Sequence, residues 1–207
     1  MRSPPHLLLP SLMVTLLALL GPSAGAVTVT VGLSISDVHY DMKVNSDERR
    51  QVTDTALVTG WLRTEWTDAS LARSGGGQTS RRLSSTAEMW LPDIRHLNTI
   101  ESASPSLLTN SSDGIVDASG KVHFETPVRF AVRFIPKDFN RSFEIRLGSR
   151  LMTTAEMNLQ PADDTLDVSE YTGWYLTNTW MWKNETTRAG FTEPFSLLVA
   201  GVFPTVI

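Results

Sequence analysis

The 207-residue sequence contains no cysteine. A chain without cysteine forms no disulfide, so packing or oligomerisation must stabilise it. The same absence excludes cysteine proteases, zinc ribbons and iron–sulfur sites. A basic excess is also missing, because 18 Lys and Arg residues against 22 Asp and Glu residues give a net charge of −4. We therefore expect no nucleic-acid partner.

Long apolar runs occur only at the two ends of the chain. The segment "MRSPPHLLLPSLMVTLLALLGPSAGA" has a positive residue, an apolar run and Ala24-Gly25-Ala26, which is typical of a secretory signal peptide. We predict a signal peptide at 1–26 and one domain at 27–207, with a membrane anchor as the alternative for the first segment. The C-terminal "PFSLLVAGVFPTVI" is too short to span a bilayer and contains Pro204, so we predict a strand there, with a truncated transmembrane helix as the alternative. These features predict a secreted, extracellular protein without membrane insertion.

Catalytic and cofactor motifs are missing as well. The sequence has no G-x-S-x-G, no H-E-x-x-H and no phosphate loop, and His39, His96 and His123 lack the spacing of metal ligands. We expect no enzyme, no cofactor and no metal site. The acidic stretch "PADDTLDVSE" at 161–170 lacks the alternating carboxylates of a calcium loop, so we favour a solvated acidic loop and leave calcium binding as the alternative.

Alternation of apolar and polar residues dominates the mature chain, while helical periodicity is absent. Residues 27–36, "VTVTVGLSIS", place Val29, Val31 and Leu33 on one face, and the apolar positions change parity after Asp37, which predicts a bulge. "DASG" at 117–120 predicts a hairpin turn between "GIV" and "KVHFETPVRFAVRF". Many short strands joined by turns predict an all-β, antiparallel sandwich or barrel.

Two tryptophans in "LVTGWLRTEWTD" have different predicted environments. Trp61 and Trp66 are separated by an odd number of residues, so a strand directs them to opposite faces. The face of Trp66 carries Ala56, Val58 and Leu62 and should face the core. Trp61 lies on the polar face, and an exposed tryptophan on a rigid strand is typical of an interface or ligand anchor. We expect most of the other four tryptophans to be core residues.

The order of several motifs resembles the extracellular ligand-binding domain of pentameric Cys-loop receptors and the acetylcholine-binding proteins. The motifs are W-x-x-x-x-W-x-D (Trp61, Trp66, Asp68), W-x-P-D (Trp90, Pro92, Asp93), I-P-x-D (Ile135, Pro136, Asp138), "LGS" (147–149) and G-W (Gly173, Trp174). The resemblance covers essentially the whole mature chain. It implies a ten-stranded antiparallel β-sandwich that assembles as a homopentamer with small-molecule sites between subunits.

The resemblance also implies which residues form the ligand site. On the complementary side it points to Trp61, Arg63, His123 and Glu125. On the principal side it points to Leu97, Arg150, Arg188, Phe191 and Phe195. The family encloses a cationic ligand in aromatic rings, whereas this sequence has Leu97 and two arginines at family aromatic positions. We therefore expect an anionic, zwitterionic or amphiphilic ligand, with pairing of the arginines to Glu125 or Glu193 in a purely structural site as the alternative.

Other departures and signals concern the type of protein. The cysteine pair of the receptors is absent, the matching loop from Val128 to Ser142 is shortened, and no membrane helices follow. The chain thus resembles the soluble binding proteins, while a structural assembly with a vestigial pocket and a truncated receptor ectodomain remain alternatives. Three N-x-S/T sequons predict glycosylation at Asn110, Asn140 and Asn184.

Overall fold

The computed structural model describes residues 25–41, 54–73, 80–83, 89–101, 105–108, 114–134, 142–171 and 176–204. Within these ranges the chain forms ten strands and one short 3-10 helix, Ala69–Leu71. The strands are β1 (Val27–Asp41), β2 (Asp54–Thr67), β3 (Ser80–Leu83), β4 (Arg95–His96), β5 (Gly114–Asp117), β6 (Lys121–Phe134), β7 (Phe143–Gly148), β8 (Met157–Asp167), β9 (Leu176–Thr186) and β10 (Phe195–Pro204).

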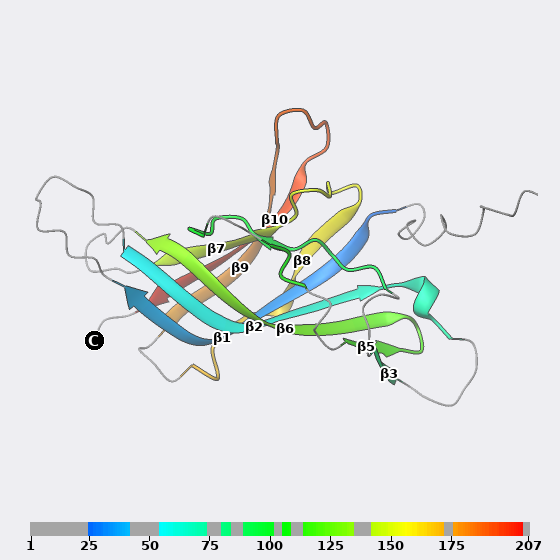
Figure 1. The fold of residues 1–207 in the computed structure, drawn as a ribbon, viewed down its shortest axis with the longest axis horizontal. Coiled ribbons are helices and arrows are strands. Elements are labelled where there is room, and N and C mark those ends of the chain that lie inside the picture. The colour runs from blue at the N-terminus through cyan, green and yellow to red at the C-terminus, as the bar shows by residue number, and fades with distance from the viewer. Residues whose placement is uncertain are drawn as a thin grey trace, which may run out of the picture.

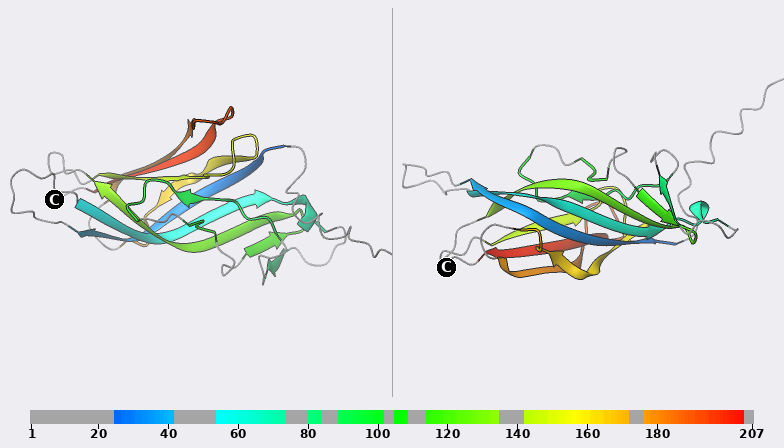
Figure 2. Two further views of the ribbon diagram at one scale, coloured as in Figure 1. Left: turned by 45° about the horizontal axis from the view of Figure 1, so that its top comes forward. Right: turned by 90° about the horizontal axis from the view of Figure 1, so that it is seen from below.

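The strands form two sheets that pack face to face (Figures 1 and 2). One sheet has the order β3-β5-β6-β2-β1-β8, and the other has the order β4-β7-β10-β9. The pairs are antiparallel except for β1 and β8, which run parallel in the described part of the chain. β8 also contacts the second sheet, because the Leu159 N–H donates a hydrogen bond to Ser196 Oγ at 3.0 Å. The predicted all-β sandwich is confirmed.

The alternation in β1 produces the expected buried face. Val29, Val31, Leu33 and Ile35 are fully buried. The β1–β2 register shifts between Ile35 and Asp37, so the bulge predicted from the change of parity is confirmed. After the bulge, Val38 faces the core.

β2 and β6 are the long central partners in the six-stranded sheet. They pair without interruption from Asp54↔Phe134 to Thr67↔Lys121. On β2 the residues predicted for the core are buried, and Trp66 packs edge-on against Trp90 with its ring 6.1 Å from that of Phe124. Trp61 is 41% exposed. The opposite facing of the two tryptophans, predicted from their odd separation, is confirmed.

The hairpin turn between β5 and β6 depends on one glycine. Gly120 has φ +87°, and a Cβ atom at this position would clash with the carbonyl oxygen of Asp68. The carbonyl oxygen of Gly120 itself accepts a hydrogen bond from the Asp68 N–H at 2.9 Å. Asp68 also caps the 3-10 helix by accepting from the Ser70 N–H. The motif aspartate after Trp66 therefore joins this turn to the end of β2.

The three C-terminal strands agree with the sequence in one respect and differ from it in two. The predicted terminal strand is β10, whose Leu198, Ala200 and Val202 face the core. The acidic stretch is not a loop throughout, because residues 161–167 continue strand β8. Trp182 on β9 is 45% exposed, so the expectation that most of the other four tryptophans are core residues does not hold for this one. Met181 occupies the buried face of β9 instead, which directs its neighbours outward.

Candidate functional site: two halves on different sheets

The first half of the site is an open groove on the outer face of the six-stranded sheet. Its volume is about 900 Å³. We call it the Trp61 groove; its lining includes Trp61, Arg63, Glu65, Arg81, Arg82, Leu107, Ile115, His123, Glu125 and Pro127. All four residues predicted for the complementary side thus line one groove, because β2 and β6 are neighbours and present their odd-numbered side chains to the same face.

Charged groups in the Trp61 groove pair with one another. Glu65 accepts from Lys121 at 2.6 Å and lies 2.8 Å from His123 Nδ1. The Lys121 ammonium, and secondarily His123, hold the pKa of Glu65 below its usual value. Arg63 donates to Ser34 Oγ at 3.1 Å and to Asp167 at 3.4 Å. Glu65 and Arg63 in the groove are therefore each already paired with partners on the same sheet.

The sequence did not reveal several groove residues. Arg81 and Arg82 lie on β3 and Ile115 lies on β5. They reach the groove because β3 pairs with β5 and β5 pairs with β6. This placement is a matter of long-range strand pairing, and no local motif signals it. The groove thus contains three arginines, Arg63, Arg81 and Arg82, besides Trp61.

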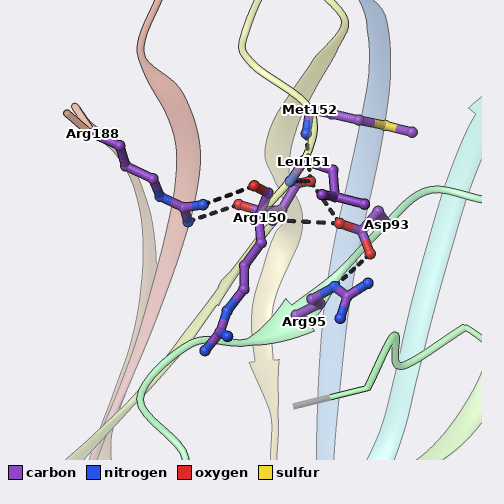
Figure 3. Close-up of polar contacts among 7 residues, drawn as sticks. Asp93, Arg95, Arg150, Leu151, Met152 and Arg188 are labelled. Atoms are coloured by element: carbon purple, nitrogen blue, oxygen red, sulfur yellow. Dashed lines mark hydrogen bonds and ion pairs between the residues drawn. The ribbon is translucent and has the colours of Figure 1, made fainter. Parts of the chain in front are cut away.

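The second half lies where three loops meet at one end of the four-stranded sheet (Figure 3). Asp93, from the W-x-P-D motif, is buried; it accepts from Arg95 Nε at 2.7 Å and from Ser149 Oγ at 2.8 Å. Ser149 Oγ in turn accepts from the Leu151 and Met152 N–H groups at 2.9 and 2.8 Å. The motif aspartate and the serine of "LGS" thus hold the segment that carries Arg150.

Arg188 attaches the β9–β10 loop to this segment. It donates to the carbonyl oxygens of Ser149 and Arg150 at 2.9 and 3.0 Å, and its guanidinium lies 4.2 Å from the centre of the Phe195 ring. Neither contact involves Glu125 or Glu193, the partners considered from sequence. Figure 1 shows the β9–β10 loop projecting from the body of the sandwich.

Aromatic and apolar side chains complete the second half. Phe195 is fully buried beneath Arg188, and Phe191 packs edge-on against it at 4.9 Å while remaining 51% exposed. Leu97 follows β4, and its Cδ1 atom lies 2.9 Å from the position that a Cβ on Gly148 would occupy. Gly148 directly precedes Ser149, so Leu97 lies beside the Arg150 segment. The five predicted principal-side residues therefore cluster.

The structure brings each predicted set together but places the two sets on different sheets. The principal-side set (Leu97, Arg150, Arg188, Phe191, Phe195) lies at the four-stranded sheet, and the complementary-side set lines the Trp61 groove. Arg150 and Phe191 are exposed at one half, and Trp61 is exposed at the other. Within one chain, the exposed residues of each half therefore face solvent and do not contact the other half.

The remaining predictions concern glycosylation sites, two family motifs, metal binding and membrane-spanning helices. Asn184 is exposed on β9, whereas Asn110, Asn140, the motif at 135–138 and Trp174 lie outside the described residues. The described residues contain no group of three or more His, Asp or Glu side chains suited to hold a metal ion. No helix in the same ranges is long and apolar enough to cross a membrane.

The two-sheet topology of the described residues gives this chain the fold of an acetylcholine-binding protein. A Capitella teleta acetylcholine-binding protein in complex with lobeline has the same fold: the TM-score is 0.75 over 88% of this chain and 85% of that one, at 17% sequence identity. The architecture predicted from the motifs is confirmed.

Sequence comparison gives the same relationship. Acetylcholine receptor subunit alpha-type acr-16 of Caenorhabditis elegans is 27% identical over 178 residues, and its Caenorhabditis briggsae counterpart is 28% identical over 179 residues. Each alignment covers 81% of this chain and 34% of the receptor subunit, so the chain spans about a third of these relatives. These proteins are receptor subunits and a binding protein rather than enzymes. No protein-family model matches the sequence.

Proposed function

We propose that this protein is a secreted small-molecule-binding domain that assembles into a homopentameric ring, without enzymatic activity. Each ligand site lies between the β9–β10 loop of one subunit and the Trp61 groove of the next. One observation carries the proposal: the two predicted half-sites are each assembled within one chain, yet they lie on different sheets. Joining them requires a second copy of the chain, as in a closed ring of like subunits.

The ligand preference follows from the charges at the second half-site. The Phe195 face is covered by Arg188, which lies 4.2 Å above it. A cationic ligand would have to displace this guanidinium from the ring and would then face Arg150. The guanidinium of Arg150 is exposed and is suited to carboxylate, sulfonate or phosphate. An anionic, zwitterionic or amphiphilic molecule therefore fits the site better than a quaternary ammonium compound.

An electron-microscopy structure of the secreted protein tests the arrangement. We expect a ring in which the β9–β10 loop of each subunit faces the Trp61 groove of its neighbour. A ring that places another surface in the joint would contradict the shared site, even if it contained five subunits.

Calorimetric titration of the assembled protein tests the ligand class. We expect very weak or no binding of acetylcholine and nicotine, because each aromatic face missing from a cation site removes about 0.5–2 kcal/mol of binding free energy. Amino acids, taurine and fatty acids are the zwitterionic, sulfonate and amphiphilic probes. Arg150→Ala should weaken the binding of an acidic probe, and Arg146→Ala, an exposed arginine on β7, is the control. Micromolar nicotine binding would contradict the assigned preference.

A structural assembly with a vestigial pocket is the second candidate. It is favoured by the internal bonds of Arg188, which join the β9–β10 loop to the Ser149 and Arg150 carbonyls while the same guanidinium lies over the buried Phe195. In that case the ring forms but none of the probes binds. The electron-microscopy and calorimetric results together separate the two candidates.

A further inference from the structure

A stacked aromatic pair lies on β9 and belongs to neither predicted half-site. Trp180 and Trp182 stack with their ring centres 3.6 Å apart and their planes inclined by 12°. Trp182 is 45% exposed, whereas Met181 between them is buried in the core. The pair therefore lies on the outer face of the four-stranded sheet, and β9 is an edge strand of that sheet. Exposed aromatic surface on an edge strand favours association with other chains unless something covers it.

The neighbouring strand β10 holds the pair in place. Trp180 pairs in register with Gly201, and Trp182 pairs with Val199. A Cβ atom on Gly201 would clash with the Trp180 ring, so this indole lies directly against the glycine backbone. Trp182 then stacks on a fixed neighbour. The exposed ring is thus a rigid platform with a low entropic cost of contact.

A predicted glycosylation site lies on the same face. Asn184 follows Trp182 by two residues on β9, and side chains at this spacing point to the same side, about 6.6 Å apart along the strand. Asn184 is exposed, and its Oδ1 accepts from the Glu185 N–H at 2.8 Å. No described hydrogen bond uses its Nδ2, which is the atom that receives the sugar. Asn184, Glu185 and Thr186 form the N-x-T sequon.

We propose that Asn184 carries an N-linked glycan whose first N-acetylglucosamine lies on the indole of Trp182 and covers the aromatic pair. The glycan is transferred from a lipid-diphosphate-linked oligosaccharide: the Asn184 Nδ2–C1 bond forms, the bond from C1 to the diphosphate oxygen breaks, and Nδ2 loses a proton as the lipid diphosphate leaves. The C–H groups on one face of the sugar meet the negative face of the indole. The contact stabilises β9 and protects the edge of the sheet.

This inference is independent of the ligand site. It requires only passage through the secretory pathway, which the N-terminal segment predicts, and it holds whether or not the protein binds a small molecule.

The experiment uses the full chain secreted from eukaryotic cells. Glycopeptide mass spectrometry measures the occupancy of Asn184, and calorimetry measures the Tm of the wild type, Thr186→Ala, Trp182→Leu and the double variant at one protein concentration. Thr186→Ala removes the sequon and leaves both Asn184 and Trp182 in place, while Thr186→Ser keeps the sequon. We expect an occupied Asn184 and a Tm drop of roughly 2–4 °C for Thr186→Ala but not for Thr186→Ser. In the Trp182→Leu background the drop should disappear.

Enzymatic trimming provides a second measurement without any substitution. An endoglycosidase that leaves the first N-acetylglucosamine should preserve the Tm. An amidase removes the whole glycan and hydrolyses Asn184 to Asp, and it should lower the Tm by the same few degrees; unglycosylated Asn184→Asp protein is the control for the added carboxylate. An unoccupied Asn184 would overturn the proposal. An equal Tm drop with and without Trp182 would overturn it too, as would Trp182-dependent association of the glycosylated protein, which would assign the aromatic pair to a second copy of the chain.

Discussion

At the scale of single residues, Trp61 and Trp66 differ in what surrounds them. Trp66 is 2% exposed and contacts Trp90 and Phe124, so we expect Trp66→Ala to lower the free energy of unfolding by about 3–5 kcal/mol. Trp61 leaves the core intact when truncated, and Trp61→Ala should change the stability of the subunit by about 0.5 kcal/mol or less. Circular dichroism during urea unfolding measures both. Similar losses for the two variants would contradict their opposite facing.

His96 provides a pH dependence at the same scale. It is buried edge-on against Phe130, and burial lowers its pKa to about 4, although a hydrogen bond with the Asn98 side chain opposes the shift. The unfolded chain has a His pKa near about 6.5 and binds the proton more tightly, so stability is complete above about pH 6.5 and falls towards about pH 4. The expected total loss is about 3 kcal/mol, at about 1.36 kcal/mol for each pKa unit.

Urea unfolding at several pH values between about 7 and about 4 measures this loss. Most of this range lies above the pKa values of the carboxyl groups, so their titration contributes mainly at its lower end. His96→Gln removes the titrating group and should flatten the curve. If the variant loses as much stability as the wild type over this range, another group is responsible for the pH dependence.

At the scale of elements, two turn glycines form a matched pair. Gly120 and Gly190 have almost the same φ, +87° and +88°, but a Cβ at Gly120 would clash with the Asp68 carbonyl, whereas the space around Gly190 is open. We expect Gly190→Ala to lower the free energy of unfolding by about 1–2 kcal/mol from the left-handed backbone alone. Gly120→Ala should lose clearly more. Denaturant unfolding compares them, and equal losses would show that the β5–β6 turn moves away from Asp68 freely.

At the scale of the whole molecule, the proposed ring would explain why the two predicted half-sites lie on different sheets of one chain. The Trp61 groove and the projecting β9–β10 loop would both be covered in a ring, and burial of their apolar groups would supply stability that disulfides cannot. Light scattering on the secreted protein should give a mass of about five subunits, as the resemblance implies. A monodisperse monomer at micromolar concentration would contradict this arrangement.

Trp61→Ala tests whether Trp61 lies between subunits of the ring. It should leave the subunit folded but cause the ring to dissociate at protein concentrations at which the wild type stays assembled. Ile115→Ala is a matched control within the groove, since it truncates a smaller exposed apolar side chain. If Trp61→Ala has the same mass as the wild type at every protein concentration, Trp61 does not contribute to the interface between subunits.

The sequence by itself determined the faces of the strands. A strand has a side-chain period of two, so local alternation decided the buried side of β1, the bulge near Ser36, the opposite facing of Trp61 and Trp66, and the turn at Gly120. These features depend on neighbours in the chain. The four complementary-side residues came from the family resemblance instead, and they line one groove because β2 and β6 pair along their length.

Only the tertiary structure decided what covers each face and which distant groups meet. Both faces of β9 carry apolar side chains, so alternation could not show that Met181 faces the core while Trp182 faces outward; the register with β10 decided it. Arg188 bonds to backbone carbonyls about 38 residues earlier in the chain, and Arg81 enters the groove through two successive strand pairings. Backbone carbonyls are present at every residue, so no sequence pattern marks the ones that a folded loop brings within reach of a guanidinium.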